Sequence, residues 1–217
     1  CHQRGPCLAG TDCHNMRHTQ PLFLPVREIF AHITGPEHRR TLYLCQEETQ
    51  RTKDLNMSIS VGETLPETTL SRLGAEGPES VSLHSVLKGR KVVLFALPGA
   101  YTGPCSTIHV PSFIRTADAF RAKGVDEIIC VAVNDPFVLK AWGEATGATA
   151  AGITMLGDSE GKLTHALKME FTAPHLGLVG RSNRYALVLE DGVITRANID
   201  EPGTCNISTG EALLAEI

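Results

Sequence analysis

The chain has 217 residues, of which 42% are hydrophobic and 20% are charged, and its formal net charge is −4 at pH 7. A chain of this length buries one substantial core in one or two domains. The small negative charge excludes the electrostatic footprint of a protein that binds nucleic acid or an acidic membrane surface. No apolar stretch approaches the roughly 20 residues that span a bilayer.

Seven cysteines occur at irregular spacing, and no two of them have the two-residue separation of a Cys-x-x-Cys motif. This pattern is not that of a disulfide framework in a secreted protein. We therefore expect a reducing compartment, the cytoplasm, in which a reactive cysteine serves chemistry rather than cross-linking.

The sequence changes character near Met57. Residues 1–56 contain four of the seven cysteines and show no sustained periodicity, whereas strand-like and helix-like patterns alternate afterwards. We expect residues 1–56 to be an N-terminal extension, either a leader or a disordered segment, and residues 57–217 to form one folded domain. The first residue is Cys1 rather than an initiator methionine, and Met57 offers a natural start for the folded part.

Two other interpretations of residues 1–56 are open. Residues 1–44 contain five arginines and three acidic residues, a bias that partly fits a presequence for a plastid or a mitochondrion. A zinc site is the second interpretation, but its spacing matches no common zinc pattern, so we expect no metal and no cofactor. Its ligands would come from Cys7, Cys13, His14 and His18.

From residue 57 onward, apolar periodicity and turn residues predict alternating strands and helices. This order predicts an α/β fold in which a mixed sheet carries helices on both faces. The predicted elements are a strand-and-turn region (Ser58 to Ser71), a helix (Leu83–Leu87), a strand (Val92–Leu97), a helix (Cys105 to Lys123), a strand (Glu127 to Val133), a helix (Pro136 to about Ala145), a strand (Ile153–Leu156), a helix (Lys162–Leu167), a hairpin (Arg184–Leu189 and Val193–Asn198) and a helix from about Ser208.

The segment from Pro98 to Cys105 is the most informative part of the chain. It follows an apolar, β-favouring run and precedes a helical pattern, so Cys105 falls in the first turn of a helix after a central strand. Free N–H groups and the helix dipole favour a thiolate there. Thr102, three residues earlier, can bring a hydroxyl to the sulfur. A lone cysteine is usually an inert buried thiol, but this setting favours a reactive one.

The spacing Pro98-x-x-x-Thr102-x-x-Cys105 resembles the Pro-x-x-x-Thr-x-x-Cys signature of the peroxiredoxins. The resemblance extends from about Met57 to Ile217 and is most similar to the type II, or peroxiredoxin-5, branch. It implies a thioredoxin-like fold and thiol-dependent reduction of hydrogen peroxide and alkyl hydroperoxides, with a role in cell redox homeostasis. The supporting segments are Lys91–Phe95, Cys105–Pro111, Lys123–Phe137, Lys140–Gly143 and Arg181–Leu187.

The resemblance also implies roles for individual residues. The thiolate of Cys105 attacks the terminal peroxide oxygen and becomes a sulfenic acid. Arg184 holds the thiolate and polarises the peroxide, because its guanidinium is always charged and reaches both partners. Thr102 hydrogen-bonds the peroxide, and Pro98 shields the sulfur from water. His109 is expected to pack or to join a polar network rather than to act as a base.

One feature departs from the family pattern. Relatives usually carry proline directly after the threonine, whereas this chain has Gly103 and then Pro104. The N–H of the residue before the cysteine helps bind peroxide in the family, and proline has no N–H. Loss of one oxyanion-type donor costs about 10²–10³ in rate in other enzymes, so slower peroxidase chemistry is expected unless another donor substitutes.

The sulfenic acid has to be recycled, and two cysteines are candidates for resolving it. Cys130 lies 25 residues after Cys105, the spacing of plant-type relatives, whereas Cys205 lies in the C-terminal loop that carries the resolving cysteine of animal relatives. Direct attack by an external thiol is the third route. The resemblance implies glutaredoxin, thioredoxin or glutathione as reductant, and a homodimer with apolar contacts near Tyr101 and Phe137.

Three other functions are alternatives to a peroxidase. A thiol hydrolase would pair Cys105 with His165 or His175, but no orienting Asp or Asn matches. A thioredoxin-like disulfide carrier would need a second thiol at residue 108, where isoleucine stands. A redox-sensing or binding module with weak peroxidase activity, in which Pro104 is the lesion, is the alternative that stays open.

Overall fold

A computed structural model describes residues 59–217 of the chain. The interpretations of residues 1–56, including the zinc site, lie outside these residues. Within the described part, no helix is long and apolar enough to cross a membrane.

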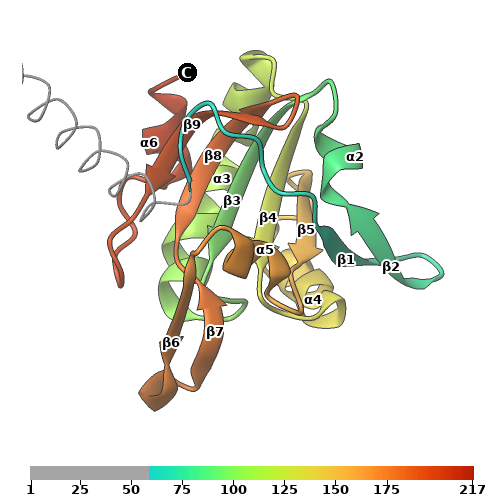
Figure 1. Cartoon of the computed structure of the whole chain (residues 1–217), viewed down its shortest axis with the longest axis vertical. Coiled ribbons are helices and arrows are strands. Elements are labelled where there is room, and N and C mark those ends of the chain that lie inside the picture. The colour runs from blue at the N-terminus through green and yellow to red at the C-terminus, as the bar shows by residue number, and fades with distance from the viewer. Residues whose placement is uncertain (1–58) are drawn as a thin grey trace, which may run out of the picture. The chain divides into compact units, whose positions relative to one another are not determined.

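A seven-stranded mixed sheet forms the centre of the fold, with strand order β2-β1-β5-β4-β3-β8-β9 (Figure 1). β3 lies between β4, which runs parallel to it, and β8, which runs antiparallel. The closing hairpin thus adds two antiparallel strands to a parallel centre, which confirms the expected mixed sheet. The strands are β1 (Thr69–Gly74), β2 (Gly77–Ser82), β3 (Lys91–Leu97), β4 (Glu127–Ala132), β5 (Ile153–Gly157), β8 (Tyr185–Glu190) and β9 (Val193–Ile199).

Helices cover both faces of this sheet. Val93 and Phe95 of β3 pack in one core with side chains of α3, α4 and α6, whereas Val92 and Leu94 pack in a second core with side chains of α2 and α5. Figure 1 shows α3 behind the sheet and α5 in front of it. Because strand residues alternate between faces, one apolar strand serves both cores. The helices are α2 (Leu83–Leu87), α3 (Val110–Ala122), α4 (Pro136–Thr146), α5 (Lys162–Ala166) and α6 (Gly210–Leu214).

Two hairpins differ from the sequence-based prediction. The expected early strand region ends too soon, because β1 continues to Gly74 and pairs antiparallel with β2. A second hairpin, β6 (Glu170–Ala173) and β7 (Leu178–Ser182), was not predicted at all; it joins through a short 3-10 turn (Pro174–Leu176) and extends away from the main sheet in Figure 1. These strands are short and contain glycine, proline or charged residues, so pairing rather than intrinsic preference forms them.

Candidate functional site

The loop after β3 is fixed by side chains from two neighbouring segments. Asn134, just after β4, accepts the N–H of Ala100 through Oδ1 at 3.0 Å. Arg181 of β7 donates to the carbonyl of Val133 at 3.0 Å, and its Nη1 lies against Gly99, where a Cβ atom would come within 2.7 Å of it. Side chains of Asn134, after β4, and of Arg181, in β7, therefore hold the Pro98–Thr102 loop.

Cys105 begins a π-helical turn, Cys105–His109, rather than the first turn of a regular α-helix. The N–H of Val110 donates to the carbonyl of Cys105, five residues earlier. Pro111 follows at once and has no N–H for the carbonyl of Thr107, so an ordinary α-helical bond cannot form there. Such wide turns are frequent at functional sites. The expected helix starts where predicted, with a different first turn.

Arg184 connects β8 to this turn. The antiparallel register pairs Tyr185 with Ala96, which brings Arg184 beside the end of β3. Its side chain is only 6% exposed. Its Nε donates to the carbonyl of Thr204 at 3.0 Å and its Nη2 donates to Sγ of Cys105 at 3.3 Å. Its Nη1 is buried without a partner, so one guanidinium donor is free beside the thiol.

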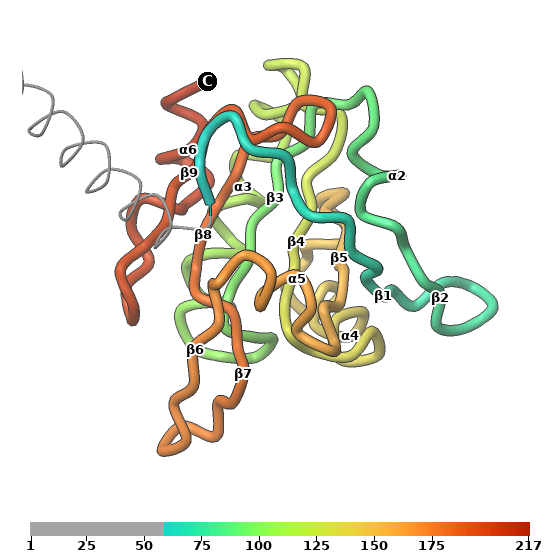
Figure 2. Tube along the Cα trace, viewed as in Figure 1, coloured from blue at the N-terminus to red at the C-terminus, as the bar shows by residue number. Residues whose placement is uncertain are grey.

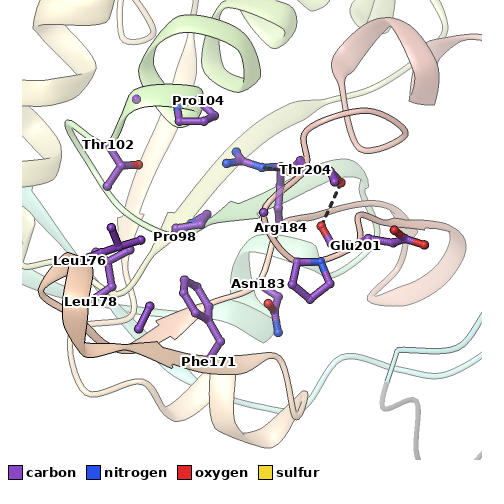
Figure 3. A pocket seen from close by; sticks show the side chains of 14 residues that line it. Pro98, Thr102, Pro104, Phe171, Leu176, Leu178, Asn183, Arg184, Glu201 and Thr204 are labelled. Carbon is purple, nitrogen blue, oxygen red and sulfur yellow. Dashed lines mark hydrogen bonds between the residues drawn. The ribbon is translucent and has the colours of Figure 1, made fainter.

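A cavity of about 640 Å³ opens beside this arginine. Figure 3 shows Arg184 and Pro104 on one side of it and the side chains of the β6–β7 hairpin on the other. The hydroxyl of Thr102 donates to the carbonyl of Gly99 at 2.8 Å, so its oxygen lone pairs are left to accept a hydrogen bond. The lining residues are Pro98, Thr102, Gly103, Pro104, Phe171, Ala173, Leu176, Leu178, Asn183, Arg184, Glu201, Pro202, Gly203 and Thr204.

The two other candidate thiols occupy different settings. Cys130 is fully buried in β4 and belongs to the same apolar cluster as Cys105. Burial, followed by the proximity of Cys105, raises the pKa of Cys130 well above its usual value. Cys205 is half-buried in the loop after β9; burial also raises its pKa, while Arg184 acts in the opposite direction. Both thiols therefore lie near the site in a protonated state.

His109, the last residue of the π-turn, is buried in a polar and aromatic environment. Its Nε2 lies 2.9 Å from the carbonyl of Ser208 and must donate to it, because a carbonyl only accepts. Burial and the positive charge of Arg184 lower the pKa of His109 to about 3. The ring is thus neutral and packs edge-on against Phe95 and Phe113, which is the network role expected.

Sequence reasoning did not find two further parts of the site. Phe171, Leu176 and Leu178 line the cavity from the unpredicted hairpin. Asp200 is buried and caps the loop that carries Cys205; the loop-forming run Asp200-Glu-Pro-Gly, followed by Asn206, was its only local signal. Among residues 59–217, no group of three or more potential ligands is placed to hold a metal.

Comparison with known proteins identifies the family. The family model described as Redoxin matches residues 60–214. Peroxiredoxin-2D of Arabidopsis thaliana is 42% identical over 157 residues, which cover 72% of this chain and 96% of the relative. Peroxiredoxin-2E-2, chloroplastic, of Oryza sativa subsp. japonica is 44% identical over 161 residues and 72% of each chain. The chain is a type II peroxiredoxin.

Solved structures agree with this assignment. Reduced Prx3 in complex with H2O2 from Vibrio vulnificus is 46% identical, with a TM-score of 0.68 over 73% of this chain and 98% of that one. Peroxiredoxin 5 from Alvinella pompejana is 34% identical, with a TM-score of 0.64 over 72% and 96%. This peroxiredoxin therefore has the thioredoxin-like fold and is a thiol peroxidase, an antioxidant oxidoreductase.

Proposed function

We propose that Cys105 is the peroxidatic cysteine and that its thiolate attacks the terminal oxygen of a hydroperoxide. An S–O bond forms and the O–O bond breaks, giving a sulfenic acid and an alkoxide or hydroxide that takes a proton to leave as alcohol or water. The observation that carries this proposal is the geometry of Arg184. One of its N–H groups points to Sγ of Cys105, and the neighbouring Nη1 has no partner.

The arrangement of Arg184 suits this reaction for an electrostatic reason. A buried guanidinium stabilises the thiolate before attack and the negative charge on the departing oxygen during attack. Thr102 supports the same role: its hydroxyl already donates to the carbonyl of Gly99, so its oxygen is left to accept a hydrogen bond from the O–H group of the hydroperoxide. Pro98 lines the cavity and keeps water from the sulfur.

The substrates we propose are hydrogen peroxide and alkyl hydroperoxides. A cavity of about 640 Å³ is far larger than hydrogen peroxide needs. Its far wall consists of Phe171, Ala173, Leu176 and Leu178 of the β6–β7 hairpin. Apolar side chains opposite the arginine suit an organic group whose peroxide end reaches the sulfur, because burial of apolar surface favours binding.

For recycling, we propose an intramolecular disulfide between Cys105 and Cys130, reduced by glutaredoxin, thioredoxin or glutathione. The two residues share one buried cluster, but Cys130 lies within a paired strand, so Cys105 has to move towards it. A disulfide requires Cα atoms within about 7 Å. Unwinding of the π-turn Cys105–His109 provides this movement. Two routes compete with this one: Cys205 resolves the sulfenic acid, or an external thiol attacks it directly.

The assembly we propose is a homodimer. Tyr101 and Phe137, which lie near the site, are 61% and 57% exposed, and large exposed apolar side chains of this kind favour a protein contact. Sedimentation at tens of micromolar tests this proposal, and a monomer there contradicts it.

The compartment we propose is the cytoplasm, with a plastid or mitochondrion as the alternative if residues 1–56 act as a presequence. Relatives named as chloroplastic and mitochondrial occur among the similar proteins. Imaging of residues 1–58 fused to a fluorescent protein distinguishes the two, because only a presequence directs the fusion to an organelle.

The experiment that tests the role of Cys105 is its replacement by serine. Cys105→Ser keeps a side chain of similar size but removes the sulfur that is proposed to form the sulfenic acid, so peroxide consumption with dithiothreitol is abolished. Circular dichroism checks that the fold is intact. Turnover above about one-tenth of the parent rate would remove Cys105 from the reaction.

A further inference from the structure

The loop between β9 and α6, residues 200–208, contains a buried carboxylate that accepts hydrogen bonds from four donors. The side chain of Asn198 adds a further tie, because its Nδ2 donates to the carbonyl of Ile207 at 2.8 Å. Asp200 is 5% exposed. It accepts the N–H groups of Asn206, Ile207 and Ser208 at 3.1, 2.9 and 3.4 Å. It also accepts the hydroxyl of Ser208 at 2.6 Å. All of these donors belong to its own loop, so the carboxylate fixes the conformation of that loop.

The same loop holds Arg184 at two points. The carbonyl of Thr204 accepts Nε of Arg184 at 3.0 Å, and the N–H of Asp200 donates to the main-chain carbonyl of Arg184 at 3.0 Å. The only other hydrogen bond of the guanidinium among the described residues is the one to Sγ of Cys105. The orientation of the guanidinium towards the sulfur therefore depends on the position of Thr204.

The end of the loop holds the π-turn. The carbonyl of Ser208 accepts Nε2 of His109 at 2.9 Å, and the hydroxyl of Ser208 lies 3.2 Å from the same nitrogen. In Figure 2 this loop, coloured red, lies beside the end of the sheet where β8 begins. One short segment thus touches both the arginine and the last residue of the turn that begins with Cys105.

We propose that Asp200 is a positioning residue for the peroxidase reaction: by closing the loop 200–208 it fixes the guanidinium of Arg184 and the π-turn of Cys105 relative to each other. The inference rests on the proposed role of Cys105. Thr204 itself lies in a turn in which its N–H and hydroxyl donate to the carbonyl of Glu201 at 3.0 and 2.9 Å. Without the carboxylate of Asp200, three backbone N–H groups and a hydroxyl lose their acceptor, so the segment that follows this turn is no longer tied back to β9. A displacement of about 1 Å at a reacting centre costs up to 10²-fold in rate.

The test compares Asp200→Asn with Asp200→Glu and with a matched control. Asparagine keeps the shape but replaces one acceptor oxygen by a donor that opposes the loop N–H groups. Asp191→Asn is the control, because Asp191 also accepts a backbone N–H, that of Gly89, but at the far end of β8. The readouts are the stopped-flow rate with hydrogen peroxide and the pH profile of Cys105 alkylation by iodoacetamide.

We expect Asp200→Asn to lower the peroxide rate between about tenfold and 10²-fold and to move the alkylation profile to higher pH. Asp200→Glu restores most of the rate, and Asp191→Asn keeps the parental values. A variant that lost only stability would leave the alkylation profile unchanged while folded. Ser208→Ala, which removes the hydroxyl but keeps the backbone, serves if Asp200→Asn does not fold, and its rate falls severalfold.

Parental rates and pH profiles in every folded Asp200 and Ser208 variant would overturn the inference. That result is distinguishable from failure of the proposed function, because Cys105→Ser is then still inactive. An active Cys105→Ser enzyme would instead remove the reaction centre that Asp200 is proposed to support.

Discussion

The two regions that carry the other thiols near Cys105 are stabilised by different kinds of hydrogen bonds. On the sheet side, Cys130 lies in a central strand paired with Phe95 of β3 and Met155 of β5. On the other side, Cys205 is half-buried in a loop whose backbone N–H groups donate to the carboxylate of Asp200. A residue in a central strand moves only with the sheet, whereas loops open at low cost. We infer from this comparison that the sheet fixes the position of the sulfur before the reaction, whereas the loop positions the arginine that is proposed to activate it.

The largest effect on the rate is expected from Arg184, whose guanidinium is hydrogen-bonded to the loop at Thr204. Arg184→Ala removes the donor to Sγ and the unpartnered Nη1 beside it, so the rate with peroxide falls by about 10²–10³. Stopped-flow mixing under single-turnover conditions measures it. Arg115→Ala is the control, since Arg115 is exposed and pairs with Glu211 on the surface. An unchanged rate in Arg184→Ala would remove the arginine from the site.

The next prediction sets the two cysteines directly against each other. Under limiting peroxide, the parent enzyme and Cys205→Ser form the Cys105–Cys130 disulfide, whereas Cys130→Ser forms none. Mass spectrometry of the non-reduced peptides identifies the pair. Because Cys130 lies within a paired strand, the π-turn has to unwind for Cys105 to reach it, so amide exchange over residues 106–109 becomes faster on oxidation.

Two results would change this view of recycling. A Cys105–Cys205 disulfide in the parent means that the loop, not the turn, moves. Full turnover of Cys130→Ser with glutaredoxin means that an external thiol resolves the sulfenic acid. Trp142, which donates to the hydroxyl of Ser106 at 3.1 Å, reports opening of the turn by its fluorescence.

A smaller effect on the rate is expected at Pro104, the residue directly before Cys105. Pro104→Thr restores an N–H just before Cys105, and the rate with peroxide should rise about tenfold if this donor limits the reaction. Stopped-flow kinetics of the variant and of Gly103→Ala, which leaves Pro104 in place, separate the donor from a general change in the loop. A flat or lower rate would mean that another donor already serves.

The last prediction concerns stability rather than rate, and it rests on His109, where the loop meets the turn. Its pKa is lowered to about 3, chiefly by burial, whereas histidine in the unfolded chain has a pKa of about 6.5. The unfolded state therefore binds a proton first, and stability falls as the pH drops from about 6.5 towards 3, by at most about 1.4 kcal/mol per pH unit. Urea unfolding of the parent and of His109→Gln at several pH values measures this slope, which is shallower in the variant. Equal slopes would contradict it.

Much of the fold could be predicted because its signals are local. The predicted strand Val92–Leu97 ends where β3 ends and starts one residue after β3 does, and Pro136 and Gly147 bound α4 as helix-start and helix-stop residues do. The β6–β7 hairpin escaped prediction because its strands are only four and five residues long, and Gly180 and Arg181 interrupt the apolar pattern of the second one. Its residues nevertheless form one wall of the cavity, so the extent of the binding site was hidden from the sequence.

The sequence by itself determined the chemistry: a thiol at the start of a helix after a central strand, with a threonine and a proline at family spacing. Only the tertiary structure decided which distant residues surround that thiol. Arg184 reaches Cys105 across 79 residues, and Asp200 acts on both through a loop. Such contacts depend on strand register and loop closure, which no local pattern encodes, because their hydrogen bonds form only when distant segments are packed together.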